Sequence, residues 1–151
     1  MYFSNKIAYF QQSVKNQEEA FDILASQLLE VDCVTEDYLQ NIIKREEAFS
    51  TGLLVNGVGI AIPHTDSQYV KTSQIAFLST DEPIDFFEMG TNDKVVKVRL
   101  IFMLALKKAD EQLETLQKLV EMIQKEEILQ KLLTCTNQNE FFEIVHGEGI
   151  K

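Results

Sequence analysis

Residues that build metal sites and disulfide frameworks are scarce in this sequence. Its 151 residues include two cysteines and two histidines. Cys33 and Cys135 lie far apart without CxxC or CxxH spacing, so we expect both to be buried as small apolar side chains. The patterns HExxH, GxSxG, GxGxxG and GxxxxGK(S/T) are also absent. These absences predict a protein without a metal site and without a cofactor.

Basic residues and long apolar runs are few as well. The 14 Lys and Arg residues are outnumbered by 24 Asp and Glu residues, which gives a net charge of −10. No basic run is dense enough to neutralise a nucleic-acid backbone. The longest nearly uncharged apolar run, residues 100–106, is far shorter than the about 20 residues that a membrane-spanning helix needs. Because the N-terminus also lacks a secretory signal, we expect a cytoplasmic protein with no nucleic-acid partner and no membrane insertion.

The length and the apolar content of 45% favour one domain over residues 1–151. Its first predicted elements are two helices. Apolar residues at spacings of three and four predict a helix over residues 18–31. Thr35 is predicted to cap a second helix, whose buried face carries Leu39 and Ile42 and whose last turns include Arg45.

Apolar runs in the middle of the chain predict strands. Residues 50–59 hold three of the six glycines, which predicts close turns, and residues 58–62 are typical of a strand buried on both faces. A second strand is predicted over residues 75–78, and a short edge strand over 83–87 after a turn. Over residues 96–106 the even-numbered positions form one apolar face, while the other face begins polar and becomes apolar. This pattern predicts a strand that is covered by helices on both sides.

The C-terminal third is predicted to be helical. Asp110 is predicted to cap a helix with one apolar face. Two shorter helices follow, the second opening with the capping-box pair Asn137 and Glu140. This order of elements predicts an α/β fold, with a mixed β-sheet sandwiched between helices on both faces.

His64 is the candidate for chemistry. Pro63 biases Ile62 toward extended backbone, so His64 follows directly on a predicted strand, where active sites of α/β proteins tend to lie. Neutral imidazole is a nucleophile, and a phosphoryl group on it is labile enough to be passed on. A lone histidine is equally compatible with an inert surface or core residue. His146 lies in a glycine-rich terminal segment and is predicted to have no function.

The pair Arg45-Glu46, followed by Ser50-Thr51-Gly52 and then by Gly59-Ile60-Ala61-Ile62-Pro63-His64, resembles the enzyme IIA domain of the fructose–mannitol superfamily. These domains belong to the phosphoenolpyruvate-dependent sugar phosphotransferase system. The resemblance covers nearly the whole chain, with its core at about residues 18–146.

The resemblance implies a phosphotransferase whose His64 takes a phosphoryl group on Nε2, the tele nitrogen. The donor would be the phosphocarrier protein HPr. The acceptor would be a cysteine of enzyme IIB, which works with the membrane enzyme IIC. Arg45 would hold phosphoryl oxygens in fork geometry, although a surface arginine paired with a carboxylate is the alternative.

Three features depart from the common pattern of this family. Residues 53–57 look like a loop extension between the arginine and the histidine. Thr65 follows His64 where many relatives have glycine, and its hydroxyl could donate to a phosphoryl group. Gln112 stands where a second active-site histidine is common, and an ordinary exposed helix residue is as good an interpretation of it. Thr51, Thr65 and Gln112 are therefore predicted supporting residues, and the longer loop with glutamine resembles the galactitol-type subgroup.

Other roles for the chain stay open at this stage. Leu53, Leu54 and Val55 are candidates for an apolar docking surface or for the core. A regulatory module of the same fold, which signals by phosphorylation-dependent protein binding, is an alternative to transport. A plain interaction domain with an inert His64 is a further alternative.

Overall fold

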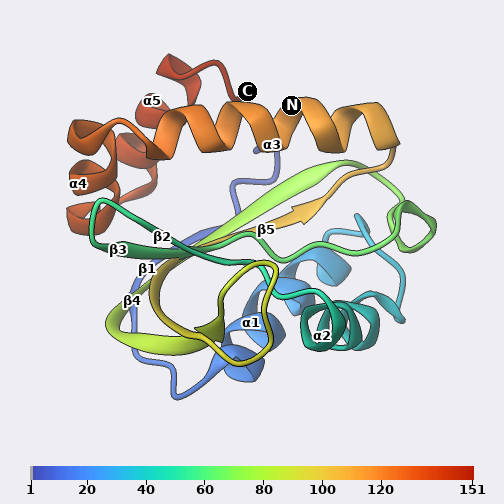
Figure 1. The fold of residues 1–151 in the computed structure, drawn as a ribbon. Helices are drawn as coiled ribbons and strands as arrows, with labels where there is room; N and C mark the ends of the chain where they lie inside the picture. Colours follow the sequence, from blue (N-terminus) through green and yellow to red (C-terminus); the bar gives the residue numbers. More distant parts are fainter. Residues whose placement is uncertain (1) are drawn as a thin grey trace.

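A five-stranded mixed sheet lies between two layers of helices (Figure 1). The computed structural model describes residues 2–151. Helices α1 and α2 cover one face of the sheet, and α3, α4 and α5 cover the other, which confirms the predicted fold class. The strands are β1 (Ala8–Gln12), β2 (Gly52–Val55), β3 (Val58–Ala61), β4 (Gln74–Phe87) and β5 (Val95–Ala105). The helices are α1 (Gln17–Glu30), α2 (Tyr38–Ala48), the 3-10 turn η1 (Ser67–Tyr69), α3 (Ala109–Ile123), α4 (Glu126–Thr134) and α5 (Gln138–Gly147).

The sheet order is β1-β4-β5-β3-β2. The pairs β1–β4 and β3–β5 are parallel, whereas β2–β3 and β4–β5 are antiparallel. Strand β1 was not predicted, because its five residues carry too short an alternation to stand out. It forms because Ala8 and Tyr9 pair with Phe77 and Leu78 of β4, a contact across almost half the chain.

Residues 53–57 were predicted to be a loop, and this is wrong, because they form most of strand β2 and the turn after it. Asn56 and Gly57 both have positive φ, 50° and 80°, as a two-residue hairpin turn requires. The hairpin pairs Leu53 with Ile60 and Val55 with Val58. Asn-Gly between two apolar runs is a strong sequence signal for a hairpin. The three glycines of residues 50–59 by themselves predicted only close turns.

The two strands predicted at residues 75–78 and 83–87 are a single strand, β4, which pairs with β5 on both sides of residues 80–83. The register shifts between Ser79 and Ile84, so the Asp81-Glu82 pair belongs to a local irregularity of the strand rather than to a turn that ends it.

Strand β5 changes its side-chain alternation at Arg99. Gly59 pairs with Val98 and Ile60 with Leu100, so Arg99 is an extra residue opposite β3. Val98 therefore packs against α1 and α2, whereas Leu100 faces α3 to α5. The prediction of one continuous face from Val96 to Leu106 is wrong for this reason: a bulge reverses the alternation.

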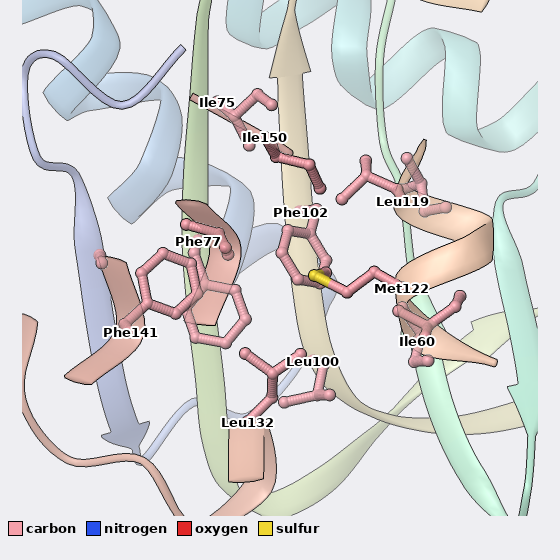
Figure 2. Close-up of a cluster of buried hydrophobic side chains, with 14 of the residues drawn as sticks. Ile60, Ile75, Phe77, Leu100, Phe102, Leu119, Met122, Leu132, Phe141 and Ile150 are labelled. Atoms are coloured by element: carbon pink, nitrogen blue, oxygen red, sulfur yellow. The ribbon is translucent and has the colours of Figure 1, made fainter. Parts of the chain in front are cut away.

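Two hydrophobic clusters fill the space on either side of the sheet. The cluster under α3, α4 and α5 contains Phe77 stacked on Phe141, with 4.4 Å between ring centroids, and Met122 near Phe102 (Figure 2). The cluster under α1 and α2 contains Phe21, Leu24 and Leu28 of α1, as predicted from their spacing. Both cysteines are buried, one in each cluster, and burial raises the pKa of both thiols.

The helix caps follow the predictions in part. The Asn137 side chain accepts a hydrogen bond from the Glu140 backbone N–H at the start of α5, as predicted. Thr35 does not cap α2, which begins at Tyr38, and its hydroxyl is buried without a partner within residues 2–151. Asp110 lies inside the first turn of α3, where the Glu111 carboxylate accepts from the Lys108 N–H instead.

Replacing Thr80 of β4 by valine should stabilise the protein. The Thr80 hydroxyl is buried and has no hydrogen-bond partner within the described residues, so valine removes an unpaired polar group at nearly constant volume. We expect the free energy of unfolding of Thr80→Val to rise by about 1 kcal/mol in urea titrations. A fall of that size would show that the hydroxyl bonds an internal water.

Candidate functional site

His64 lies just beyond β3, alongside the end of β5. The chain continues from Ala61 beside β5, where His64 forms a parallel bridge with Leu104 and the Leu104 N–H donates to the Pro63 oxygen at 2.9 Å. The imidazole is partly exposed. The end of β5, η1 and the start of α3 lie on the same side of the molecule (Figure 1). The prediction that His64 is presented at a strand exit is confirmed.

The hydrogen bonding of the His64 ring defines which nitrogen carries the proton. His64 Nδ1 lies 2.9 Å from the carbonyl oxygen of Ile62. A carbonyl oxygen can only accept, so Nδ1 must donate a proton to it. Nε2 makes no hydrogen bond within residues 2–151, and in the neutral ring it holds the free lone pair.

Glu46 and Thr51 form a buried network that reaches the backbone of Ile62, two residues before His64. The Glu46 side chain, 5% exposed, accepts from the Thr51 N–H and from the Thr51 hydroxyl, both at 2.8 Å. The Thr51 Oγ1 in turn accepts from the Ile62 N–H at 3.3 Å. The network therefore ties the last turn of α2 to the residue whose carbonyl holds His64. Thr51 was a predicted supporting residue, whereas the role of Glu46 was missed although it stands in the Arg45-Glu46 pair.

Two effects shift the pKa of the Glu46 carboxyl in opposite directions. Burial raises its pKa, because the charged form loses its hydration. The two hydrogen bonds from Thr51 favour the charged form and offset part of this rise.

Arg45 lies in the last turn of α2, one residue before Glu46. Its guanidinium sits over the Phe49 ring, 4.5 Å from the centroid, and makes no ion pair or hydrogen bond within the described chain. The alternative of a surface arginine paired with a carboxylate is therefore not what the structure shows. The five donors of the guanidinium remain available to an anion.

Thr65 and Gln112 are the other two predicted supporting residues. Thr65 follows His64, and its side chain is 6% exposed. Gln112 is partly exposed in the first turn of α3, and its side chain makes no hydrogen bond within residues 2–151. No hydrogen bond joins either side chain to His64 in the part of the chain that the structure describes. Hydrogen bonds therefore connect His64 to Thr51 by way of the Ile62 backbone. Within residues 2–151, none connects His64 to the side chain of Thr65 or Gln112.

A groove of about 820 Å³ is lined by the start of α1, the end of α2 and the second half of β4, and His64 is not among its lining residues. Within residues 2–151, no three His, Cys, Asp or Glu side chains gather as a metal ion would require, and no helix is long and apolar enough to cross a membrane.

Apolar side chains are exposed on the hairpin and after α2. Leu53 and Val55 are partly buried against the cluster under α3 to α5, so these two candidates for a docking surface belong largely to the core. Leu54 points the other way and is 64% exposed. Phe49, beneath the Arg45 guanidinium, is 62% exposed and was missed as a surface candidate.

One known protein family matches nearly the whole chain. Residues 1–147 match the family described as "Phosphoenolpyruvate-dependent sugar phosphotransferase system, EIIA 2". The chain belongs to this family. It is therefore an EIIA-type domain, as the sequence resemblance implied.

Two curated relatives align with most of this chain. The galactitol-specific EIIA component of Escherichia coli K12 is 28% identical over 132 residues, which cover 86% of this chain and 87% of that protein. The transcriptional regulator ManR of Bacillus subtilis is 32% identical over 133 residues, which cover 87% of this chain. The chain spans only about a fifth of the length of ManR, 19%.

Solved structures share the fold of this EIIA domain. A putative PTS IIA, PtxA, from Streptococcus mutans superposes with a TM-score of 0.80 at 19% identity, covering 97% of this chain and 91% of that one. The mannitol IIA of Escherichia coli superposes with a TM-score of 0.74 at 21% identity, covering 94% and 97%.

The buried carboxyl of Glu46 should make the stability of this EIIA domain depend on pH. Its raised pKa means that the folded state holds the proton more tightly than the unfolded state, so its stabilising contribution is lost as pH rises through the folded-state value. We expect the free energy of unfolding of wild type, relative to Glu46→Gln, to fall as pH rises above the ordinary glutamate pKa of about 4.3. Urea titrations at several pH values measure it.

The neighbouring Glu47 provides the matched control, because it is exposed on the same helix. Glu47→Gln removes the same charge and should leave the pH dependence of wild type unchanged. An equal effect of both substitutions would contradict the assignment to the buried carboxyl.

Proposed function

We propose that this EIIA domain carries a phosphoryl group on Nε2 of His64, between a phosphohistidine of HPr and a cysteine of enzyme IIB. The observation that carries the proposal is the bond from His64 Nδ1–H to the Ile62 oxygen, 2.9 Å, which leaves the Nε2 lone pair free. A nucleophile with its lone pair outward on an accessible ring suits transfer between proteins, which requires no small-molecule pocket.

Each transfer exchanges one bond to phosphorus for another. In the first step the Nε2 lone pair forms a bond to the phosphorus, while the bond to the donor nitrogen breaks and its electron pair returns to the donor imidazole. In the second step a cysteine thiolate attacks the same phosphorus, and the electron pair of the broken N–P bond returns to His64 Nε2. In both steps the proton stays on Nδ1, hydrogen-bonded to the Ile62 oxygen.

Side-chain donors of Arg45, Thr65 and Gln112 would stabilise the transferred group. The Arg45 guanidinium has no carboxylate partner within residues 2–151 and could bind two phosphoryl oxygens at once. Thr65 and Gln112 would contribute neutral donors from the loop after His64 and from the first turn of α3. Gln112 offers an amide donor but cannot titrate as a second histidine would.

The proposed partners are proteins of the cytoplasm. One solved relative, the mannitol IIA of Escherichia coli, is described in complex with phosphorylated enzyme IIB, which supports IIB as the acceptor here. HPr as the donor rests on the sequence resemblance. Enzyme IIC would be reached only through IIB, and the exposed Phe49 and Leu54 would contribute apolar contacts to docking.

A galactitol-like sugar alcohol is the substrate that we propose for the transport system. The EIIA component of the galactitol system aligns with this chain along most of both lengths, which supports this choice. Because EIIA transfers only the phosphoryl group, the sugar would be recognised by the partner components.

A regulatory role is the second candidate. The similarity to a segment of ManR supports it, since that protein is a transcriptional regulator. In this case the phosphoryl group on His64 would alter the binding of another protein or domain. A transfer assay separates the two roles: a phosphorylated chain that labels the cysteine of a galactitol-type IIB acts in transport, and one that labels no IIB is regulatory.

His64→Ala should abolish phosphorylation by phosphoenolpyruvate, enzyme I and HPr, because it removes the nucleophile. The assay follows acid-labile label on the protein. His146→Ala is the matched control, since His146 is the other histidine and is exposed at the end of α5. We expect His146→Ala to be labelled at the wild-type rate. Labelling of folded His64→Ala would overturn the proposed function.

Arg45→Ala should slow labelling by about 100-fold, because the transition state loses its cationic donors. The fold should persist, since Arg45 makes no hydrogen bond or ion pair through its side chain within residues 2–151. Lys44→Ala removes the same charge from the exposed neighbouring position and should label normally. Equal rates for the two variants would exclude a specific role of Arg45.

A further inference from the structure

Side chains of helix α2 are hydrogen-bonded to two backbone segments next to His64, one directly and one through Thr51. Near its start, the Tyr38 hydroxyl donates to the Leu104 oxygen at 2.9 Å, and Leu104 forms the bridge with His64. Near its end, Glu46 reaches Ile62 through Thr51. Tyr38 and Glu46 are both buried, and the hydrogen bonds of each lead to a backbone segment next to the histidine.

The direction of each hydrogen bond in this network follows from its donors. Thr51 Oγ1 accepts from the Ile62 N–H, so its own single proton must be given elsewhere. The Glu46 Oε1 atom takes it, and Oε2 takes the Thr51 N–H. A carboxylate accepts both, whereas an amide has a single acceptor oxygen, so its NH2 group would face the Thr51 hydroxyl and leave the hydroxyl proton without an acceptor. The charge at position 46 therefore orients the Thr51 hydroxyl with a lone pair toward Ile62.

The backbone between Ile62 and His64 is restrained from both sides. Thr51 holds the Ile62 N–H, and Leu104 holds the Pro63 oxygen. Pro63 fixes its own φ and restricts Ile62 to extended geometry. The Ile62 oxygen is consequently held in the one place where it can accept from His64 Nδ1. Without this acceptor, the imidazole in water would prefer its proton on Nε2, the nitrogen that must stay free.

We propose that Glu46 is a positioning residue, which acts through Thr51 and the Ile62 backbone to hold His64 in the Nδ1–H tautomer with Nε2 free. This inference rests on the function proposed above for its consequence in phosphoryl transfer. The tautomer itself is a property of the unphosphorylated protein and is measurable without any partner.

Imidazole ¹⁵N NMR tests the proposal. Spectra are recorded in a His146→Ala background, so that His64 is the sole histidine. We expect the parent protein to show protonated Nδ1 and unprotonated Nε2. In Glu46→Gln and in Thr51→Val the Nε2–H form should appear, and the initial rate of labelling from phosphorylated HPr should fall at least about tenfold. Thr51→Ser keeps the hydroxyl and should restore the parent spectrum and rate.

Two matched variants control for the substitutions themselves. Glu47→Gln makes the same change at the exposed neighbour, and Thr80→Val makes the same change at a buried hydroxyl without a partner in residues 2–151. Both should keep the Nδ1–H tautomer. Backbone amide spectra establish that each variant is folded, and Glu46→Gln, which nearly preserves side-chain volume, decides the matter if Thr51→Val fails to fold.

The possible outcomes distinguish a failure of this inference from a failure of the proposed carrier function. An unchanged tautomer in folded Glu46→Gln overturns the positioning role, whatever happens to the rate, and leaves the carrier function standing. A parent protein that shows the Nδ1–H form but takes no label overturns the carrier function alone. A tautomer change in Glu46→Gln that is absent from Glu47→Gln supports the positioning role.

Discussion

One buried carboxylate joins the parts from which the site is built. Placing Glu46 inside the protein costs free energy unless the charge is compensated by hydrogen bonds, and Thr51 provides two of them. These bonds are possible only when the end of α2 lies against the start of β2 and the exit of β3. The cost of burying this carboxylate therefore makes the arrangement of helix and strands around His64 strongly preferred over any that leaves it unpaired.

The pairing of β3 with β5 also restrains the backbone that leads to His64. Strand β3 lies so close to β5 that a Cβ at Gly59 would be 1.8 Å from the Lys97 oxygen, so only glycine fits where Arg99 is the extra residue. The parallel pairing resumes beyond this bulge and continues to the bridge between His64 and Leu104. Both faces of β5 are covered by helices, which keeps the strand that supports His64 rigid.

Much of the site was within reach of the sequence because its signals are local. Pro63 constrains its neighbours directly, so the placement of His64 at a strand exit followed from three consecutive residues. The spacing of apolar residues likewise located α1 and β5. Signals that depend on distant partners were weaker: β1 becomes a strand through its pairing with β4, and the bulge at Arg99 arises from how β5 meets two neighbours.

By itself, the sequence determined the α/β class, the family and the position of His64, since periodicity and a contiguous motif express them along the chain. The tertiary structure alone decided the direction of the proton on His64. That choice depends on Glu46 accepting from Thr51, on Thr51 accepting from the Ile62 N–H, and on the bridge between His64 and Leu104, which is 40 positions after His64. A hydrogen-bond donor is recognisable from its residue type, but its partner is known only once the chain has folded.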